Sequence, residues 1–225
     1  MGAALRSSGD VQEAIKCYEK SLEIKPGNAT TYYNQGNAFV SCGNLERAIE
    51  SYKQALKIKP DYAEVYNKMG IILKNVVFKE TSTGLIEIID DLLSKTELVR
   101  PREIATAAIS LLKFEASLKD IFSKHILGKL DSSLEEVILE LTKQPLLLKL
   151  MEVCPLPDLE LEVLLRDIRS AILFDISNLK NNQEILTFQT ALALQCFTNE
   201  YLYKKTDEET IALEILEKSI AKDLA

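Results

Sequence analysis

Small, aromatic and polar positions in the first third of the chain repeat at a spacing of 34 residues. The pattern is clearest between Tyr32 and Pro60, and parts of it reappear one period earlier and one period later. The matching positions are Gly9 and Gly43, Ala14 and Ala48, Ile15 and Ile49, Tyr18 and Tyr52, Leu22 and Leu56, Pro26 and Pro60, Tyr32 and Tyr66, and Gly36 and Gly70. A fixed period of this length predicts stacked helix-turn-helix units, in which neither helix buries its apolar face alone.

Residue size and chemistry explain the spacing within one unit. Gly36 and Ala48 are small, so two helices can approach closely there, and Tyr52 can fill the gap between them. Asn44 is placed to cap the second helix. Pro60 follows its last turn, where a missing N–H costs little. We interpret all of these residues as packing or capping residues, and we expect function in side chains that the units leave exposed.

This repeat resembles the tetratricopeptide repeat (TPR) over roughly residues 1–78, with one full copy between two partial copies. The positions that match are Tyr32, Gly36, Phe39, Ala48, Tyr52, Ala55 and Pro60. The resemblance implies a solenoid whose concave groove is lined by the first helix of each unit and binds a peptide or protein. By the same register Gly2 corresponds to Gly36, so the chain begins in mid-repeat and we expect it to be a piece of a longer protein.

The same register predicts which side chains line the groove. The expected partner-binding residues are Tyr33, Asn34, Asn37, Asn67, Lys68 and Ile71. Amide side chains can hold an extended peptide because each offers both a donor and an acceptor. Asn34 resembles the asparagine ladder of some peptide-binding TPR arrays, but Lys68 stands at the next rung, and Glu64 stands where the carboxylate clamp of chaperone-binding arrays needs a lysine. A solvated concave face, or one filled by the C-terminal helices of the same chain, remains an alternative.

The repeat pattern stops within the third unit. Its first helix is expected over residues 61–75, but the alanine expected in the second helix falls on Ser82. The apolar residues 76–78 stand where a polar turn was due, and residues 79–84 are expected to form a loop. We therefore place a domain boundary after residue 78.

Residues 79–225 are predicted to be helical without a repeat. Leu85, Ile88, Ile89 and Leu92 follow the i, i+3, i+4, i+7 spacing of an amphipathic helix. Later helices are expected to start at Pro101, at Ser132 or Ser133, at Pro145, at Asp158 (through about Ile176), at Asn181 (through Tyr203) and at Thr206. No strand pattern competes. The predicted fold is all-α, with a TPR solenoid in residues 1–78 followed by a compact bundle of about seven helices in residues 79–225.

The second half also resembles a known helical segment. The stretches 109–114, 145–162 and 191–201 look like a segment that joins a TPR array to a methyltransferase domain in marine bacterial proteins. The resemblance implies that the chain is an accessory part, substrate-recruiting or regulatory, of a larger S-adenosylmethionine-dependent enzyme. No strand followed by a Gly-rich turn is present to be that enzyme, so we expect this chain itself to be non-catalytic and to need no cofactor.

Charge and composition narrow the range of partners. The chain carries a net charge of −7, concentrated in the second half, which argues against nucleic acid because phosphate binding needs clustered basic side chains. No apolar run is long enough to span a bilayer. Four widely spaced cysteines without a C-x-x-C pair indicate reduced thiols and a cytoplasmic protein. The remaining partners are a peptide, another protein or a second copy of the chain.

Candidate catalytic and metal-binding groups are few. Asp90 and Asp91 are adjacent on a helix and point about 100° apart, so we interpret them as surface charge. The single histidine, His125, makes a metal site improbable. Gln195 and Asn199 share one face of an apolar helix, which favours a structural hydrogen-bond network over a binding site.

Overall fold

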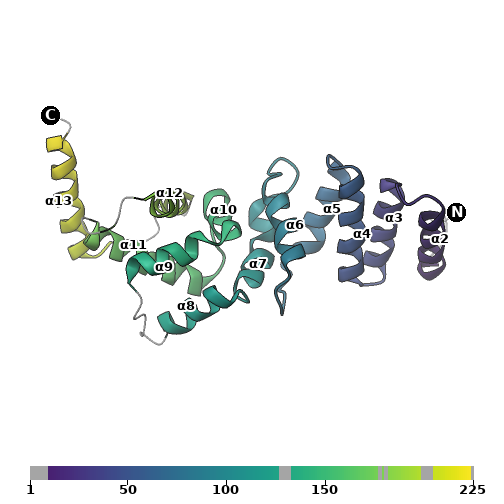
Figure 1. The fold of residues 1–225 in the computed structure, drawn as a ribbon, viewed down its shortest axis with the longest axis horizontal. Coiled ribbons are helices and arrows are strands. Elements are labelled where there is room, and N and C mark those ends of the chain that lie inside the picture. The colour runs from purple at the N-terminus through teal and green to yellow at the C-terminus, as the bar shows by residue number, and fades with distance from the viewer. Residues whose placement is uncertain (1–9, 127–132, 177–178, 180–181, 199–204, 224–225) are drawn as a thin grey trace.

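The computed structural model describes residues 10–126, 133–176, 179, 182–198 and 205–223, and every regular element in them is a helix (Figure 1). The all-α fold class is therefore confirmed. The first four helices are α2 (Val11–Ile24), α3 (Ala29–Ser41), α4 (Leu45–Ile58) and α5 (Ala63–Leu73). The starts of α2 and α4 lie 34 residues apart, as do those of α3 and α5, so the helices keep the period of the sequence. The partial repeat expected around Gly2 lies outside the described part.

The pair α3 and α4 packs as its residue sizes predict. A Cβ atom on Gly36 would lie only 2.5 Å from a ring carbon of Tyr52, which is fully buried. Ala48 is also fully buried, so the two helices meet along small residues and one aromatic ring. Asn44 caps α4, because its side-chain oxygen accepts a hydrogen bond from the Arg47 N–H at 3.1 Å.

Regular stacking ends after α5. Residues 74–82 contain no helix, and within them Asn75 has a positive φ of 60°. The Phe78 N–H donates to the Ser110 hydroxyl on α7 (Pro101–Leu112) at 2.9 Å, which ties this segment to a later helix. The loop predicted over residues 79–84 ends earlier than expected, because α6 (Thr83–Leu93) already begins at Thr83.

The helix after the break does not complete a third regular unit. Helix α5 packs against α7, and α6 packs against α7 and α10 (Pro145–Val153). The link between α5 and α6 includes Tyr66, whose hydroxyl lies 2.8 Å from the Asp91 carboxylate and 3.0 Å from the Pro60 carbonyl oxygen. The segment 74–82 thus carries the chain away from the solenoid and into the C-terminal half.

The C-terminal half occupies the left side of Figure 1. Its further helices are α8 (Ala116–Ile126), α9 (Leu134–Thr142), α11 (Leu159–Asp175), α12 (Gln183–Thr198) and α13 (Asp207–Asp223). Helices α9, α10 and α12 pack together, while α11 contacts α8, α9 and α13. The described residues after position 79 therefore hold eight helices where the sequence suggests about seven, and α13 extends from the end of the group (Figure 1).

Buried apolar side chains link the two halves. They form one connected cluster from Ala14 on α2 to Leu192 on α12. The repeats and the later helices share a core at α5, where a Cβ atom on Gly70 would lie 3.0 Å from Val99. The division of the chain after residue 78 stays a prediction.

Local capping chemistry sets most of the later helix starts. The predicted starting residues found at the cap or in the first turn are Pro101, Ser133, Pro145, Asp158 and Thr206. For α12 the cap is Asn182, whose side chain accepts from the Ile185 N–H at 2.8 Å. The caps expected at Ser132 and Asn181 lie outside the described residues.

Candidate partner-binding surfaces

The exposed face of α3 and α5 holds four of the six side chains predicted to line the groove. We call Asn34, Asn67, Lys68 and Ile71 the α3–α5 face. Asn34 is half-buried, whereas Asn67, Lys68 and Ile71 are exposed, with Ile71 at 63%. Within the described part of the chain the two amide side chains, those of Asn34 and Asn67, have no hydrogen-bond partner.

The other two predicted residues, Tyr33 and Asn37, pack against neighbouring helices. The Tyr33 ring lies between those of Tyr52 and Tyr62, with centroid distances of 6.1 and 5.4 Å. Asn37 is only 8% exposed and accepts a hydrogen bond from the Tyr52 hydroxyl at 2.9 Å. Their side chains hold the repeat together, and their place in a binding groove stays a prediction.

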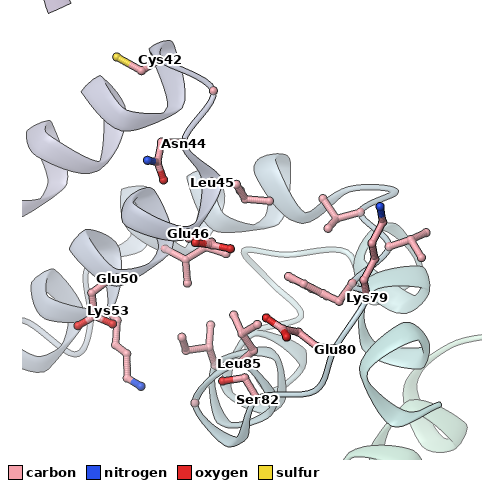
Figure 2. Close-up of a pocket in the computed structure, with 17 residues that line it drawn as sticks. Cys42, Asn44, Leu45, Glu46, Glu50, Lys53, Lys79, Glu80, Ser82 and Leu85 are labelled. Carbon is pink, nitrogen blue, oxygen red and sulfur yellow. The ribbon is translucent and has the colours of Figure 1, made fainter. Parts of the chain in front are cut away.

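A hollow opens between α4 and the start of α6, apart from the α3–α5 face (Figure 2). We call it the α4–α6 cleft, and its volume is about 940 Å³. Its walls are residues 42–46, Ile49, Glu50 and Lys53 on one side, and residues 76–80, Ser82, Gly84, Leu85 and Ile88 on the other. None of the α3–α5 face residues lines it, so the two surfaces are separate.

Charges in the α4–α6 cleft are unevenly placed. The carboxylates of Glu46 and Glu80 enter the space from opposite walls (Figure 2). Neither forms an ion pair among the residues the structure describes. The ammonium groups of Lys53 and Lys79 lie at the outer edges, away from these two carboxylates (Figure 2). The inner part of the cleft is therefore negative.

Comparisons with known proteins identify the first part of the chain. A family model described as "TPR repeat" matches residues 2–40 and 36–76. Residues 2–76 are TPR repeats. The match confirms the family that the 34-residue period suggested, and TPR repeats support a function in protein–protein interaction. The α4–α6 cleft lies where these TPR repeats end.

Other comparisons add little to the TPR assignment. No curated protein matches the chain. Among solved structures, one titled "Crystal structure of MamA" is 18% identical, covers 98% of this chain and 97% of its own, and has a TM-score of 0.33. A similarity of this size does not establish a common arrangement of the helices. The link expected between residues 79–225 and a methyltransferase has no support in these comparisons and stays a prediction.

Sequence reasoning did not find the α4–α6 cleft. One clue was present, since residues 76–78 are apolar where the TPR pattern calls for a polar turn. Their effect could not be inferred, because the cleft depends on where Phe78 and α6 are held by residues far away in the sequence.

Titratable groups elsewhere are engaged in links between helices. Lys113 lies 2.7 Å from both Asp158 and Glu160, which joins the end of α7 to the start of α11. Burial lowers the pKa of Lys113, but hydrogen bonds to the two carboxylates and their charges outweigh it and raise the pKa overall. Burial, and then the hydrogen bond to Asp91, raise the pKa of Tyr66. These shifts belong to packing contacts, and neither group lies in the cleft.

The residues weighed for catalysis or metal binding lie apart. Asp90 lies 3.3 Å from Lys149, and His125 lies 3.0 Å from Asp167. No group of three metal-ligating side chains occurs in the described residues. Burial raises the pKa of Cys154 to about 11, which disfavours the thiolate. Gln195 is fully buried, while its predicted network partner Asn199 lies outside the described part.

The membrane question has a direct structural answer for the described residues. In them, no helix combines the length and the apolar character needed to cross a bilayer.

Proposed function

We propose that this chain is a non-catalytic interaction module and that its α3–α5 face binds a peptide or protein partner. The single observation behind this choice is the exposure of Asn67, Lys68 and Ile71 on the first helix of a TPR unit. An apolar side chain beside exposed amide and ammonium groups offers both burial and hydrogen bonds to a polypeptide. The four cysteines, all within the described residues, form no disulfide, which is consistent with a partner in the cytoplasm.

The chemistry of the face favours an extended partner. Asn34 on α3 and Asn67 on α5 come from successive repeats, so their amides can contact neighbouring parts of one strand. Ile71 lies one helical turn beyond Asn67 and can pack against an apolar side chain of the same strand. The amides of Asn34 and Asn67 would then fix the orientation of the bound strand, and Ile71 would add apolar contact area.

The test compares two variants at exposed apolar positions. Ile71→Asp introduces a charge on the α3–α5 face, and Ile24→Asp introduces the same charge at the end of α2, where Ile24 is 87% exposed. Neither change removes a buried side chain, so both proteins should fold. The wild type and both variants are used to capture proteins from extract of the source cells, and the captured proteins are quantified by mass spectrometry.

We expect at least one protein to be retained by the wild type and by Ile24→Asp but lost with Ile71→Asp. Equal retention by all three would show that binding occurs elsewhere on the chain. If light scattering shows a dimer that Ile71→Asp dissociates, the partner is a second copy of the chain. A set of captured proteins that Ile24→Asp loses as well would contradict a role for this face.

A further inference from the structure

We propose that the α4–α6 cleft is a second binding site, specific for a partner segment that combines apolar and basic side chains. This second site is distinct from the α3–α5 face, because other residues form it and it would bind a partner of defined chemistry. The occupant is inferred from three properties of the cleft, namely its apolar walls, its charge and the way its walls are held.

The walls of the cleft expose apolar surface that nothing in the described chain covers. Val77 is 65% exposed, and Leu45, Phe78, Leu85 and Ile88 are half-buried around it. Removing such surface from water is favourable in proportion to its area, so an apolar side chain from a partner would be attracted here.

The charge of the cleft selects among apolar partners. Glu46 and Glu80 approach from opposite walls and have no ion-pair partner in the residues that the structure describes (Figure 2). An ammonium or guanidinium group placed between them would be attracted by both, whereas a carboxylate there would be repelled by both. This arrangement favours a lysine or arginine next to the apolar residue of the bound segment.

Both walls are held in place without a ligand. Asn44 caps the start of α4 two residues before Glu46, and the Ser110 hydroxyl accepts a hydrogen bond from the Phe78 N–H of the other wall. A site that is already formed binds with a smaller loss of conformational entropy. The cleft thus has the pre-formed shape, the apolar lining and the negative interior that a basic, apolar segment requires.

A displayed library of random short peptides is the first probe. The library is selected on the full chain and counter-selected on the double variant Glu46→Lys, Glu80→Lys. Peptides that remain should combine Leu, Ile, Val or Phe with Lys or Arg. Their dissociation constants, measured by fluorescence anisotropy, should rise about tenfold or more in the double variant, because two attractive charges become repulsive.

The matched control is Glu23→Lys, Glu217→Lys, which changes net charge equally at exposed positions on α2 and α13. It should leave affinity within about twofold, apart from weak long-range effects that salt screens. A loss equal to that of the cleft variant would mean that the peptides are attracted to the acidic chain as a whole. Selected peptides without basic residues, or no selected peptides, would also overturn the assignment.

The apolar part is tested at positions where folding is not at risk. Val77→Ser should weaken the selected peptides several-fold, while Ile24→Ser should not, since both residues are largely exposed but only Val77 lines the cleft. Unchanged affinity in Val77→Ser would contradict apolar recognition there. The variant Ile71→Asp should leave these peptides bound, so this experiment can fail or succeed independently of the α3–α5 face.

Discussion

A single methyl group at position 36 tests how tightly the repeat is packed. The added Cβ of Gly36→Ala would lie 2.5 Å from the fully buried ring of Tyr52, so one of the two groups would have to shift. Overpacking of this kind costs about 1–3 kcal/mol, against a gain of about 0.5–1 kcal/mol from replacing a helical glycine. Urea unfolding should show a net destabilisation. Gly27→Ala, with no atom within 4 Å of the new Cβ, should stay near the wild type.

Two asparagines of the predicted groove should behave differently on substitution by alanine. Asn37→Ala removes the hydrogen bond that the buried Tyr52 hydroxyl donates to Asn37 and should reduce the free energy of unfolding by about 0.5–1.5 kcal/mol. Asn67→Ala removes an exposed side chain and should change stability by less than about 0.5 kcal/mol. Partner binding, in contrast, should be weakened by Asn67→Ala. A stability loss of equal size in both would contradict the structural role given to Asn37.

At the scale of an element, the docking of α13 should depend on pH through Glu209. This carboxylate is 3% exposed and lies 3.0 Å from Arg169 on α11. Burial would raise the pKa of Glu209, but hydrogen bonds from Thr206 and Ser170 and the charge of Arg169 hold it below the ordinary carboxyl value. Because the folded pKa is lowered, the stabilisation is present at neutral pH and is lost as the pH falls through that lowered value.

Hydrogen exchange of α13 measures this dependence. Its amides should lose protection as the solution is acidified below the ordinary carboxyl range, and Glu209→Gln should show reduced protection already at neutral pH. Glu208→Gln changes an exposed neighbour in the same first turn and should keep the wild-type profile. Identical profiles for both variants would show that α13 is held by its other contacts.

Some helix positions could be predicted from the sequence, and others could not. Helix starts at Asn44, Ser133 and Thr206 could be predicted because a cap involves residues only three positions apart. The position of α6 could not, since it depends on Tyr66 meeting Asp91, 25 residues away in the sequence. Without that position there was no basis for the α4–α6 cleft.

The 34-residue register identifies exposed positions on α5, but it does not predict the contacts that α3 makes with neighbouring helices. Asn67 and Ile71 are exposed on α5, as the 34-residue period implies. Tyr33 and Asn37 lie on the corresponding part of α3, yet Tyr52 reaches both of them from α4. Such contacts depend on side-chain direction and helix spacing, which a period in one sequence does not specify.

For the whole molecule, the connected core makes a prediction about cooperativity. Tyr66 and Met69 on α5 are buried in the cluster that continues into the C-terminal helices, and α5 packs directly on α7. Shared burial of this kind couples the unfolding of neighbouring units. We therefore expect the protein to show one calorimetric transition, with equal calorimetric and van't Hoff enthalpies. This holds even if residues 1–78 and 79–225 are separate domains by sequence.

Tyr66→Phe tests that coupling at the contact between α5 and α6. The change keeps the buried ring but removes the hydroxyl that contacts Asp91 on α6, and should cost about 0.5–3 kcal/mol because Asp91 is charged. If the halves unfold together, the whole transition moves to lower temperature without broadening. If they unfold separately, the variant splits the transition or shifts only part of it. Tyr32→Phe, at the matching repeat position of α3, is the control, since its half-buried hydroxyl has no hydrogen-bond partner among the described residues and its loss should leave the transition in place.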